Sequence, residues 1–222
     1  MAANTFYMKE RSKIQKFKDF IALPLRAVAL FEVNKWGLTS TQAERFEYAA
    51  KEVRGHCLDI GCGKYNLFVQ KYLNGNGVGV DVFPYEGLTE KNVVASLENF
   101  PFPNRSFDSV TFIASLNHVP KELRDKELAE SNRCLNPGGN VVVTMPCAFA
   151  GVLIHKIVAA YDSVFSTHYD VDSVRGMHED EDYYLPDAEI IERLKRAGFR
   201  DITKKYFWTQ WGMNHAFIGW KK

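Results

Sequence analysis

A short apolar run that stops abruptly at two closely spaced glycines limits the choice of fold more than any other part of the sequence. Residues Cys57 to Ile60 predict a buried strand, Gly61 and Gly63 predict a tight turn, and the stretch 67–73 predicts a helix. Only glycine leaves a backbone bare enough for a nucleotide-like ligand to approach it closely. The pattern indicates a ligand site at the carboxyl end of the first strand, although glycines after a strand also serve as plain tight turns.

Strand and helix signals alternate along the middle and the end of the chain. Short apolar runs predict further strands, and periodic stretches between them predict helices. This alternation is typical of an α/β protein whose parallel sheet is covered by helices on both faces. The predicted strands cover 78–82, 109–114 and 140–144, with two more between 202 and 220, and the predicted helices cover 122–135 and 187–197.

Asp81 lies near the end of the second predicted strand, well past Gly63. A carboxylate at this point can accept hydrogen bonds from both hydroxyls of a ribose. A surface Asp that merely ends a strand is the alternative interpretation. The third glycine of a dinucleotide fingerprint would fall at Asn66, so the turn favours an adenosyl ligand over a dinucleotide.

Three short motifs follow downstream of the glycine turn. They are Phe100-Pro101-Phe102, Ser106-Phe107-Asp108 and Leu135-Asn136-Pro137-Gly138-Gly139. Together with the glycine turn and Asp81, they resemble a class I S-adenosylmethionine-dependent methyltransferase of the small-molecule type, over about residues 56–146 and more loosely over 186–220. The resemblance implies a Rossmann-like, doubly wound sheet of seven strands, mostly parallel, with the last strand antiparallel.

The resemblance assigns the glycine turn and the second strand to the cofactor. Asp59, Gly61, Cys62 and Gly63 would line the methionine part of S-adenosylmethionine. Asp81 would hold the ribose through its carboxylate.

Four further positions match the family's contacts to the adenine and to the methionine end. Val82 would pack on the adenine, and Leu97 would offer it a backbone N–H. Many relatives have, at the position of Ser96, an Asp that binds the adenine amino group, and a hydroxyl there would bind more weakly. Ser115, just past the strand at 109–114, would face the methionine end.

His118 is the candidate catalytic residue. It follows the strand at 109–114, on the edge where ligands collect in an open α/β sheet. Methyl transfer from a sulfonium is an in-line displacement, so the protein mainly aligns the nucleophile with the methyl group. An imidazole, with an unperturbed pKa of about 6.5, can take the proton of an alcohol or phenol at neutral pH. A histidine that only caps or packs at a helix start is the alternative.

The chain is predicted to consist of a helical extension or lid, residues 1–54, and a methyltransferase domain, residues 55–222. The domain carries an insertion at 147–185, after the fifth strand, which relatives often use as a substrate lid. The insertion holds several potential metal ligands, but their spacing matches no established metal site, so no metal is predicted. These ligands are His168, Asp170, Asp172 and His178.

The extension is predicted to contain two helices. Apolar residues at near-helical spacing run from Ile14 to Val28, and residues 9–26 carry six basic and two acidic side chains, a local charge of +4. Such a helix either docks its apolar face on the domain, which is favoured, or makes a weak contact with a membrane surface. The second helix is predicted to start after Thr39-Ser40-Thr41 and to run towards Val53, with Thr41 and Glu44 at the spacing of a capping box.

Composition argues against several classes of function. The 222 residues carry 28 basic and 27 acidic side chains, a net charge of +1, which provides no global field for binding nucleic acid. The four cysteines form no C-x-x-C pair, which favours reduced thiols in a cytoplasmic protein over a zinc site or a disulfide scaffold. No stretch approaches the roughly 20 apolar residues that cross a bilayer.

The sequence therefore predicts a cytoplasmic enzyme that uses S-adenosylmethionine to methylate a small-molecule or lipid-linked acceptor, with oxygen slightly favoured over nitrogen or carbon. A methyltransferase-like binding module without catalysis is one alternative, and the loss of the usual Asp at Ser96 keeps it open. A nicotinamide-dependent oxidoreductase is a weaker alternative, because the third glycine of its fingerprint is missing.

Overall fold

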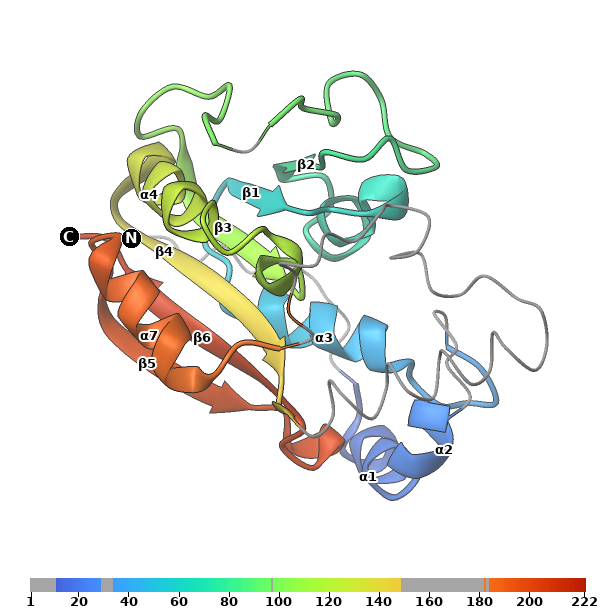
Figure 1. Cartoon of the computed structure of the whole chain (residues 1–222). Helices are drawn as coiled ribbons and strands as arrows, with labels where there is room; N and C mark the ends of the chain where they lie inside the picture. Colours follow the sequence, from blue (N-terminus) through green and yellow to red (C-terminus); the bar gives the residue numbers. More distant parts are fainter. Residues whose placement is uncertain (1–10, 29–33, 97, 149–181, 183) are drawn as a thin grey trace.

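The computed structural model describes residues 11–28, 34–96, 98–148, 182 and 184–222 of the chain. Its centre is a six-stranded sheet in the order β2-β1-β3-β4-β6-β5 (Figure 1). The first four strands of this order run parallel, whereas β6 runs antiparallel to both of its neighbours, as predicted for the last strand. The strands are β1 Cys57–Ile60, β2 Gly77–Val80, β3 Phe107–Ile113, β4 Leu135–Pro146, β5 Arg200–Tyr206 and β6 Asn214–Trp220.

The order of the strands reverses at β1. The chain passes from β1 to β2 on one side and then returns to place β3 on the other side of β1. Such a switch point leaves a crevice outside the carboxyl ends of the strands, which is the usual ligand site of an open α/β sheet. The predicted Rossmann-like, doubly wound α/β class is therefore confirmed.

The described residues form six strands where seven were predicted. Beyond β2, the next segment makes a single parallel bridge between Asp81 and Val93. Two main-chain hydrogen bonds hold it, from Asp81 N to Asn92 O and from Val94 N to Asp81 O. Pro84 and neighbouring turns interrupt the chain on its way to this bridge, so the pairing does not grow into a ladder.

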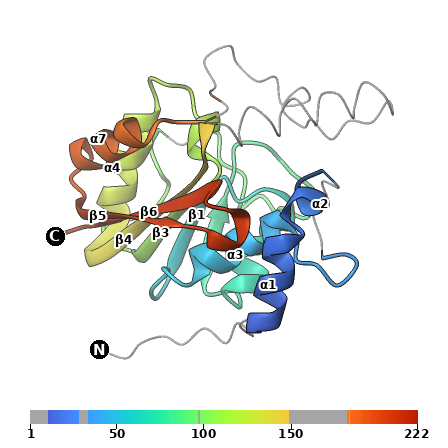
Figure 2. The ribbon, with the colours of Figure 1, turned by 90° about the horizontal axis from the view of Figure 1, so that it is seen from below.

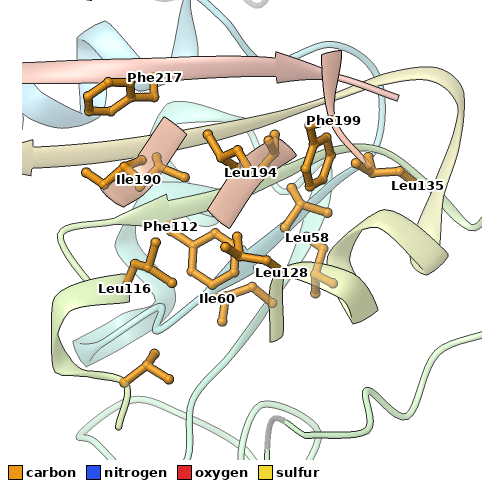
Figure 3. Close-up of a cluster of buried hydrophobic side chains, with 14 of the residues drawn as sticks. Leu58, Ile60, Phe112, Leu116, Leu128, Leu135, Ile190, Leu194, Phe199 and Phe217 are labelled. Atoms are coloured by element: carbon orange, nitrogen blue, oxygen red, sulfur yellow. The ribbon is translucent and has the colours of Figure 1, made fainter. Parts of the chain in front are cut away.

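Helices cover both faces of the sheet (Figure 2). One face packs against α4 (Arg124–Cys134) and α7 (Asp187–Arg196), and the other packs against α3 (Thr41–Ala50) and the π-helix η2 (Phe68–Tyr72). Successive side chains of a strand point to opposite faces, so alternate residues of β4 pack against the helices on one face and on the other. Figure 3 shows the first layer, where the apolar side chains of α4 and α7 lie over the strands.

The start of α3 differs from the prediction. Ser40 is the N-cap residue, and its hydroxyl accepts a hydrogen bond from Ala43 N at 3.0 Å. Glu44 does not turn back to cap the helix, because Arg26 Nη2 binds its Oε2 at 2.5 Å. The capping box predicted for Thr41 and Glu44 is therefore wrong, since a charge-assisted bond to a guanidinium outweighs a bond to a main-chain N–H.

The N-terminal segment forms two short helices, α1 (Lys13–Ile21) and α2 (Leu23–Val28), instead of one. Their apolar and polar faces are inverted relative to the prediction of a docked apolar face. Asp19 and Arg26 are 0% and 1% exposed, whereas Ile14 and Phe17 are 71% and 61% exposed. The prediction that the apolar face packs on the domain is wrong, because the polar face makes the attachment.

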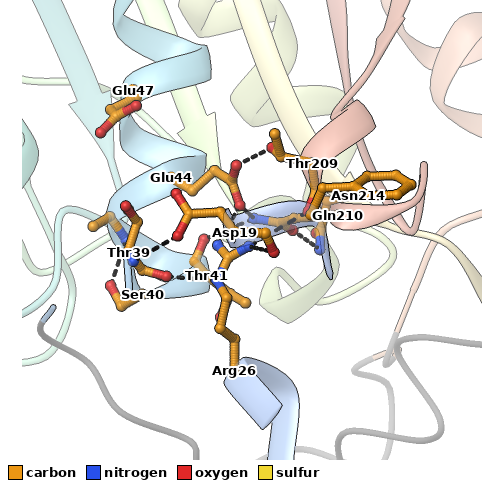
Figure 4. A network of polar contacts seen from close by, with 12 residues as sticks. Asp19, Arg26, Thr39, Ser40, Thr41, Glu44, Glu47, Thr209, Gln210 and Asn214 are labelled. Atoms are coloured by element: carbon orange, nitrogen blue, oxygen red, sulfur yellow. Dashed lines mark hydrogen bonds and ion pairs between the residues drawn. The ribbon is translucent and has the colours of Figure 1, made fainter. Parts of the chain in front are cut away.

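A buried ionic cluster makes this attachment (Figure 4). Arg11 contacts both Asp19 and Glu44, at 2.7 and 2.8 Å, and Arg26 contacts Glu44 at 2.5 Å. The hydroxyl of Thr209 also donates to Glu44. Since Thr209 lies in η4 (Trp208–Gln210), between β5 and β6, the cluster joins the first helices to the end of the chain.

Candidate functional site

A cavity of about 500 Å³ opens where β1, β2 and β3 end. Its position is the one that the strand order creates, because the sheet reverses direction at β1. The lining combines glycine backbone, one acidic residue from the second strand and a loop after the third. The lining residues are Ile60, Gly61, Gly63, Asp81, Val82, Phe83, Tyr85, Ala95, Ser96, Ala114, Ser115, His118, Val119, Pro120, Leu123 and Glu127.

The glycine turn forms the cavity wall through close backbone packing. Gly61 has φ +75°, and a Cβ atom there would lie 2.5 Å from the Cβ of Ser115. Ser115 in turn donates a hydrogen bond to Ile60 O at 2.7 Å, so the ends of β1 and β3 are held together. Gly63 also has a positive φ, but a Cβ there would meet no atom within 4 Å, which leaves open space beside its backbone.

Asp81 is oriented before any ligand arrives. Its two carboxylate oxygens accept hydrogen bonds from Gly63 N and from Phe83 N, both at 3.0 Å. The residue is only 5% exposed, yet it lines the cavity. A carboxylate has about four lone-pair sites, so acceptor capacity remains for a ligand.

Two residues predicted to contact the cofactor lie behind the cavity wall. Asp59 is 2% exposed, and its Oδ1 accepts a hydrogen bond from Thr111 Oγ1 at 2.6 Å. Burial, partly offset by the bond from Thr111, raises the pKa of Asp59 to about 7. Cys62 is also buried, and burial raises the pKa of its thiol. Neither side chain is part of the cavity lining.

Of the three residues predicted to contact the adenine, two lie in the cavity wall. Val82 and Ser96 both line the cavity, and Val82 is 56% exposed. The hydroxyl of Ser96 accepts a hydrogen bond from Glu98 N at 3.1 Å. Leu97 lies outside the described residues, as do the potential ligands of the insertion, His168, Asp170, Asp172 and His178.

His118 lines the same cavity, at the end of the short helix η3 (Leu116–His118). A buried guanidinium fixes this loop: Arg124 donates to Val119 O at 2.8 Å and to Asn117 O at 3.1 Å. Arg124 also binds Asp182 at 2.8 Å. The loop that carries the candidate base is therefore anchored on both sides of His118.

Sequence reasoning missed Glu127. This residue lines the cavity from α4, is 4% exposed, and its Oε2 has no hydrogen-bond partner in the described part of the chain. Burial and the nearby Glu98 raise its pKa to about 8. In the sequence it stands among the charged residues of the predicted helix 122–135, so no local pattern indicated its position.

Neither a candidate metal centre nor a candidate membrane span occurs among the described residues. No group of three or more His, Cys, Asp or Glu side chains is placed to hold a metal ion within the described ranges. Among the helices of the same ranges, none is long and apolar enough to cross a bilayer.

Comparison with protein families gives one match that covers most of the chain. The family described as "Methyltransferase domain" matches residues 38–204. This range contains β1 to β4, α7, most of β5 and the whole lining of the cavity.

Among curated proteins, the chain is similar to two methyltransferases over part of its length. It is 32% identical over 102 residues to a sterol 4-C-methyltransferase of Caenorhabditis elegans, a match that covers 40% of this chain and 30% of that protein. It is 29% identical over 163 residues to a ubiquinone/menaquinone biosynthesis C-methyltransferase of Brucella anthropi, covering 67% of this chain and 59% of that protein. The chain therefore spans less than two thirds of either relative.

Among solved structures, the fold is similar to that of an S-adenosylmethionine-dependent methyltransferase of Thermotoga maritima described as a possible histamine N-methyltransferase. The TM-score is 0.54 at 16% identity, over 94% of this chain and 96% of that chain. At this identity the likeness concerns the fold.

Proposed function

Because the chain belongs to the class I methyltransferase domain family, we propose that its cavity binds S-adenosylmethionine and that the protein transfers the methyl group to a small-molecule or lipid-linked acceptor. The observation that carries the proposal is the position of Asp81, whose oriented carboxylate lines a cavity at the switch point of the sheet beside open glycine backbone. That arrangement suits a ribose placed next to a bare turn.

The residues present fit the cofactor. Asp81 would accept hydrogen bonds from the ribose hydroxyls. The open space at Gly63 would hold the methionine part of the cofactor, which adjoins the ribose. Val82 would pack against the adenine, and Ser115 would face the methionine end. S-adenosylmethionine supplies the activated methyl group, so the remaining tasks of the protein are to align the acceptor and to manage its proton.

We assign to His118 the role of the base that takes up the proton of the methyl acceptor. Its loop is anchored by Arg124, so the imidazole stays at the cavity wall and can accept a proton from the acceptor. A base serves oxygen acceptors, which give up the O–H proton, and carbon acceptors, whose carbon loses a proton before or after the methyl group is added. The preference for oxygen remains a prediction from the sequence. The names of the two curated relatives favour carbon as the competing choice.

The same names favour an apolar, lipid-like acceptor, since one relative is named for sterols and the other for ubiquinone and menaquinone. The apolar part of the cavity wall, made by Val119, Pro120 and Leu123, suits such a molecule. The division into an extension of residues 1–54 and a domain of residues 55–222, like the cytoplasmic location, remains a prediction.

Calorimetry with S-adenosylhomocysteine tests the first part of this proposal. The wild-type protein is expected to bind S-adenosylhomocysteine, the product of the cofactor. A dissociation constant of about 1 mM corresponds to a weak complex, so no binding at about millimolar ligand would contradict the proposal. NADH serves as the negative control, and tight binding of NADH instead would favour an oxidoreductase. Incubation with methyl-labelled cofactor and a total lipid extract then tests transfer. Product binding without any labelled lipid or small molecule would favour a non-catalytic module.

A further inference from the structure

The outward face of α1 and α2 is apolar, and no layer of the described fold covers it. Ile14, Phe17 and Ile21 recur at helical spacing and are 71%, 61% and 60% exposed, and Leu25 of α2 is 51% exposed. We call these four residues, with the partly exposed Phe20, the N-terminal apolar surface. Scattered exposed apolar residues are ordinary, but a contiguous stripe marks an interaction surface.

Tryptophans border this surface. The ring of Phe20 lies 6.0 Å from that of Trp208 and 6.1 Å from that of Trp211, and both tryptophans are 50% exposed. Trp211 donates its indole N–H to Phe20 O at 2.8 Å, which fixes its position against α1. Tryptophan is enriched where protein meets the boundary between lipid and water, because its ring is apolar and its N–H is polar.

Basic side chains flank the apolar stripe. Each residue of an α-helix turns by about 100°, so Lys13 and Lys18 lie on opposite flanks of the stripe formed by Ile14, Phe17 and Ile21. Both lysines are exposed. The one acidic residue of α1, Asp19, is buried and bound to Arg11, so it does not offset them. The flanks are therefore positive, which disfavours a second copy of the same surface as the occupant.

The surface lies at the edge of the sheet where the cavity opens. Pro146, the last residue of β4, pairs with Asn214, the first residue of β6, and η4 directly precedes that strand. η4 packs against α1 through the rings of Trp208 and Phe20, and Arg26 of α2 donates to Thr209 O, so the two helices sit beyond the carboxyl end of β4 (Figure 1). A bilayer on this side would present lipids to the same edge as the cavity.

We propose that the N-terminal apolar surface docks on an anionic lipid bilayer, with Ile14, Phe17 and Ile21 entering the boundary layer and Lys13 and Lys18 facing lipid phosphates. The polar side of the same helices stays bound to the domain, so docking requires no unfolding. This inference does not depend on cofactor binding.

Flotation with lipid vesicles tests it. The full chain is expected to float with vesicles of phosphatidylcholine and phosphatidylglycerol and to float weakly with phosphatidylcholine alone. Binding should fall at about 1 M salt, where the Debye length is about 3 Å. Lys13→Glu with Lys18→Glu should weaken binding by at least about tenfold, since each basic residue contributes appreciably near an anionic surface.

Matched control variants distinguish specific docking by this surface from non-specific binding to vesicles. Phe17→Ser with Ile21→Ser should abolish binding, whereas Tyr206→Ser, which removes an equally exposed ring on β5, should leave it unchanged. Lys71→Glu with Lys91→Glu is the charge control, because both lysines are exposed elsewhere. Equal flotation of all variants, or dimerisation lost in the Phe17 variant while vesicles remain unbound, would overturn the proposal.

A second, independent observation concerns Glu127. Buried polar groups without a partner are rare, so a carboxyl oxygen that lies in the wall of a cavity and has no partner among the described residues points to a ligand that bonds it. With a pKa of about 8, the group holds its proton at neutral pH. It then offers one O–H donor and one carbonyl acceptor, the same pair that a side-chain amide offers.

Adenine matches that pair. It presents an amino donor beside a ring-nitrogen acceptor, an edge that a side-chain amide reads with two hydrogen bonds. We infer that Glu127 reads the adenine ring of the bound cofactor, an inference that rests on the proposed function. Ser96, which lines the same cavity, would then contribute the weaker contact.

Calorimetry with S-adenosylhomocysteine and S-inosylhomocysteine, which has oxygen in place of the amino group, tests this inference. Wild type should prefer the adenine compound. Glu127→Ala should lower its affinity by about tenfold and erase the preference, whereas Glu127→Gln should retain both. Glu122→Ala, an exposed acidic residue just before α4, is the control. Unchanged binding by Glu127→Ala overturns this inference alone, and a wild type that binds neither compound overturns it together with the proposed function.

Discussion

The carboxylate of Asp81 accepts a hydrogen bond from the main-chain N–H of Gly63 at 3.0 Å, so the end of the second strand holds the turn that follows the first. One side chain thus shapes the glycine turn and faces the cavity. Both tasks depend on a negatively charged oxygen at the same place.

Asp81→Ala should weaken binding of S-adenosylhomocysteine by about 1–3 kcal/mol, the scale of losing hydrogen bonds to a charged group. Calorimetry measures the change. Glu90→Ala is the control. It removes an exposed acidic side chain from the same segment between β2 and β3, and the variant should bind the ligand as the wild type does. An unchanged dissociation constant in Asp81→Ala would contradict the ribose assignment.

The two glycines of the turn should respond differently to alanine. A Cβ at Gly61 would lie 2.5 Å from Ser115 Cβ, so Gly61→Ala should destabilise the fold by about 1–3 kcal/mol in urea denaturation. A Cβ at Gly63 meets nothing within 4 Å, so Gly63→Ala should lose less stability but should bind S-adenosylhomocysteine more weakly. Equal stability losses in the two variants would show that only the positive φ matters.

Removal of one partner from the buried ionic cluster should be costly. Arg26 and Glu44 have fully buried side chains, so Arg26→Met leaves a buried carboxylate with fewer partners and should destabilise the protein by about 3–5 kcal/mol. Lys205→Met breaks the exposed pair with Glu52 and should cost less than about 1 kcal/mol. Urea denaturation compares the two, and losses of similar size would argue against a structural role for the cluster.

His118→Ala should slow methyl transfer by about 10²–10⁴-fold if the imidazole is the general base. Affinity for S-adenosylhomocysteine should stay nearly unchanged, because the residue acts on the acceptor. His56→Ala, a histidine stacked on Phe107 away from the cavity, is the control and should leave the rate intact. Equal rates in His118→Ala and wild type would remove it as the base.

His215 should make stability depend on pH. Burial, assisted by the charge of Lys204, lowers its pKa to about 4 from an ordinary value near 6.5. The unfolded chain therefore takes up a proton below pH 6.5 that the folded chain refuses, so stability present above that pH is lost as the pH falls towards 4. The loss amounts to about 3 kcal/mol by linkage. His215→Gln should flatten this slope in urea titrations at several pH values.

The sequence predicted the parts of the site that are built from local signals. A strand that stops at Gly61 and Gly63 and a second strand that ends near Asp81 determine where the cavity lies, because parallel strands end at one edge. Side-chain direction was less predictable. Asp59 precedes the turn by only two residues, yet Thr111 on the neighbouring strand draws it behind the wall.

Long-range electrostatics explains the other differences. The apolar spacing from Ile14 onward predicted a docked helix, and no local signal shows that Arg11 and Arg26 meet Glu44 and the far end of the chain. A charged cluster of this kind forms only in three dimensions. It overrides the rule that the apolar side of a helix faces inward.

The single β-bridge between Asp81 and Val93 has a consequence for how the cavity wall is held together. The main chain of this residue is held by Asn92 and Val94, while its side chain is held by Gly63 and Phe83. Asp81 and Ser96, which both line the cavity, are therefore linked through these main-chain hydrogen bonds and the short segment 92–96. In the proposed complex, the groups that contact the ribose and the adenine would therefore belong to one hydrogen-bonded backbone unit.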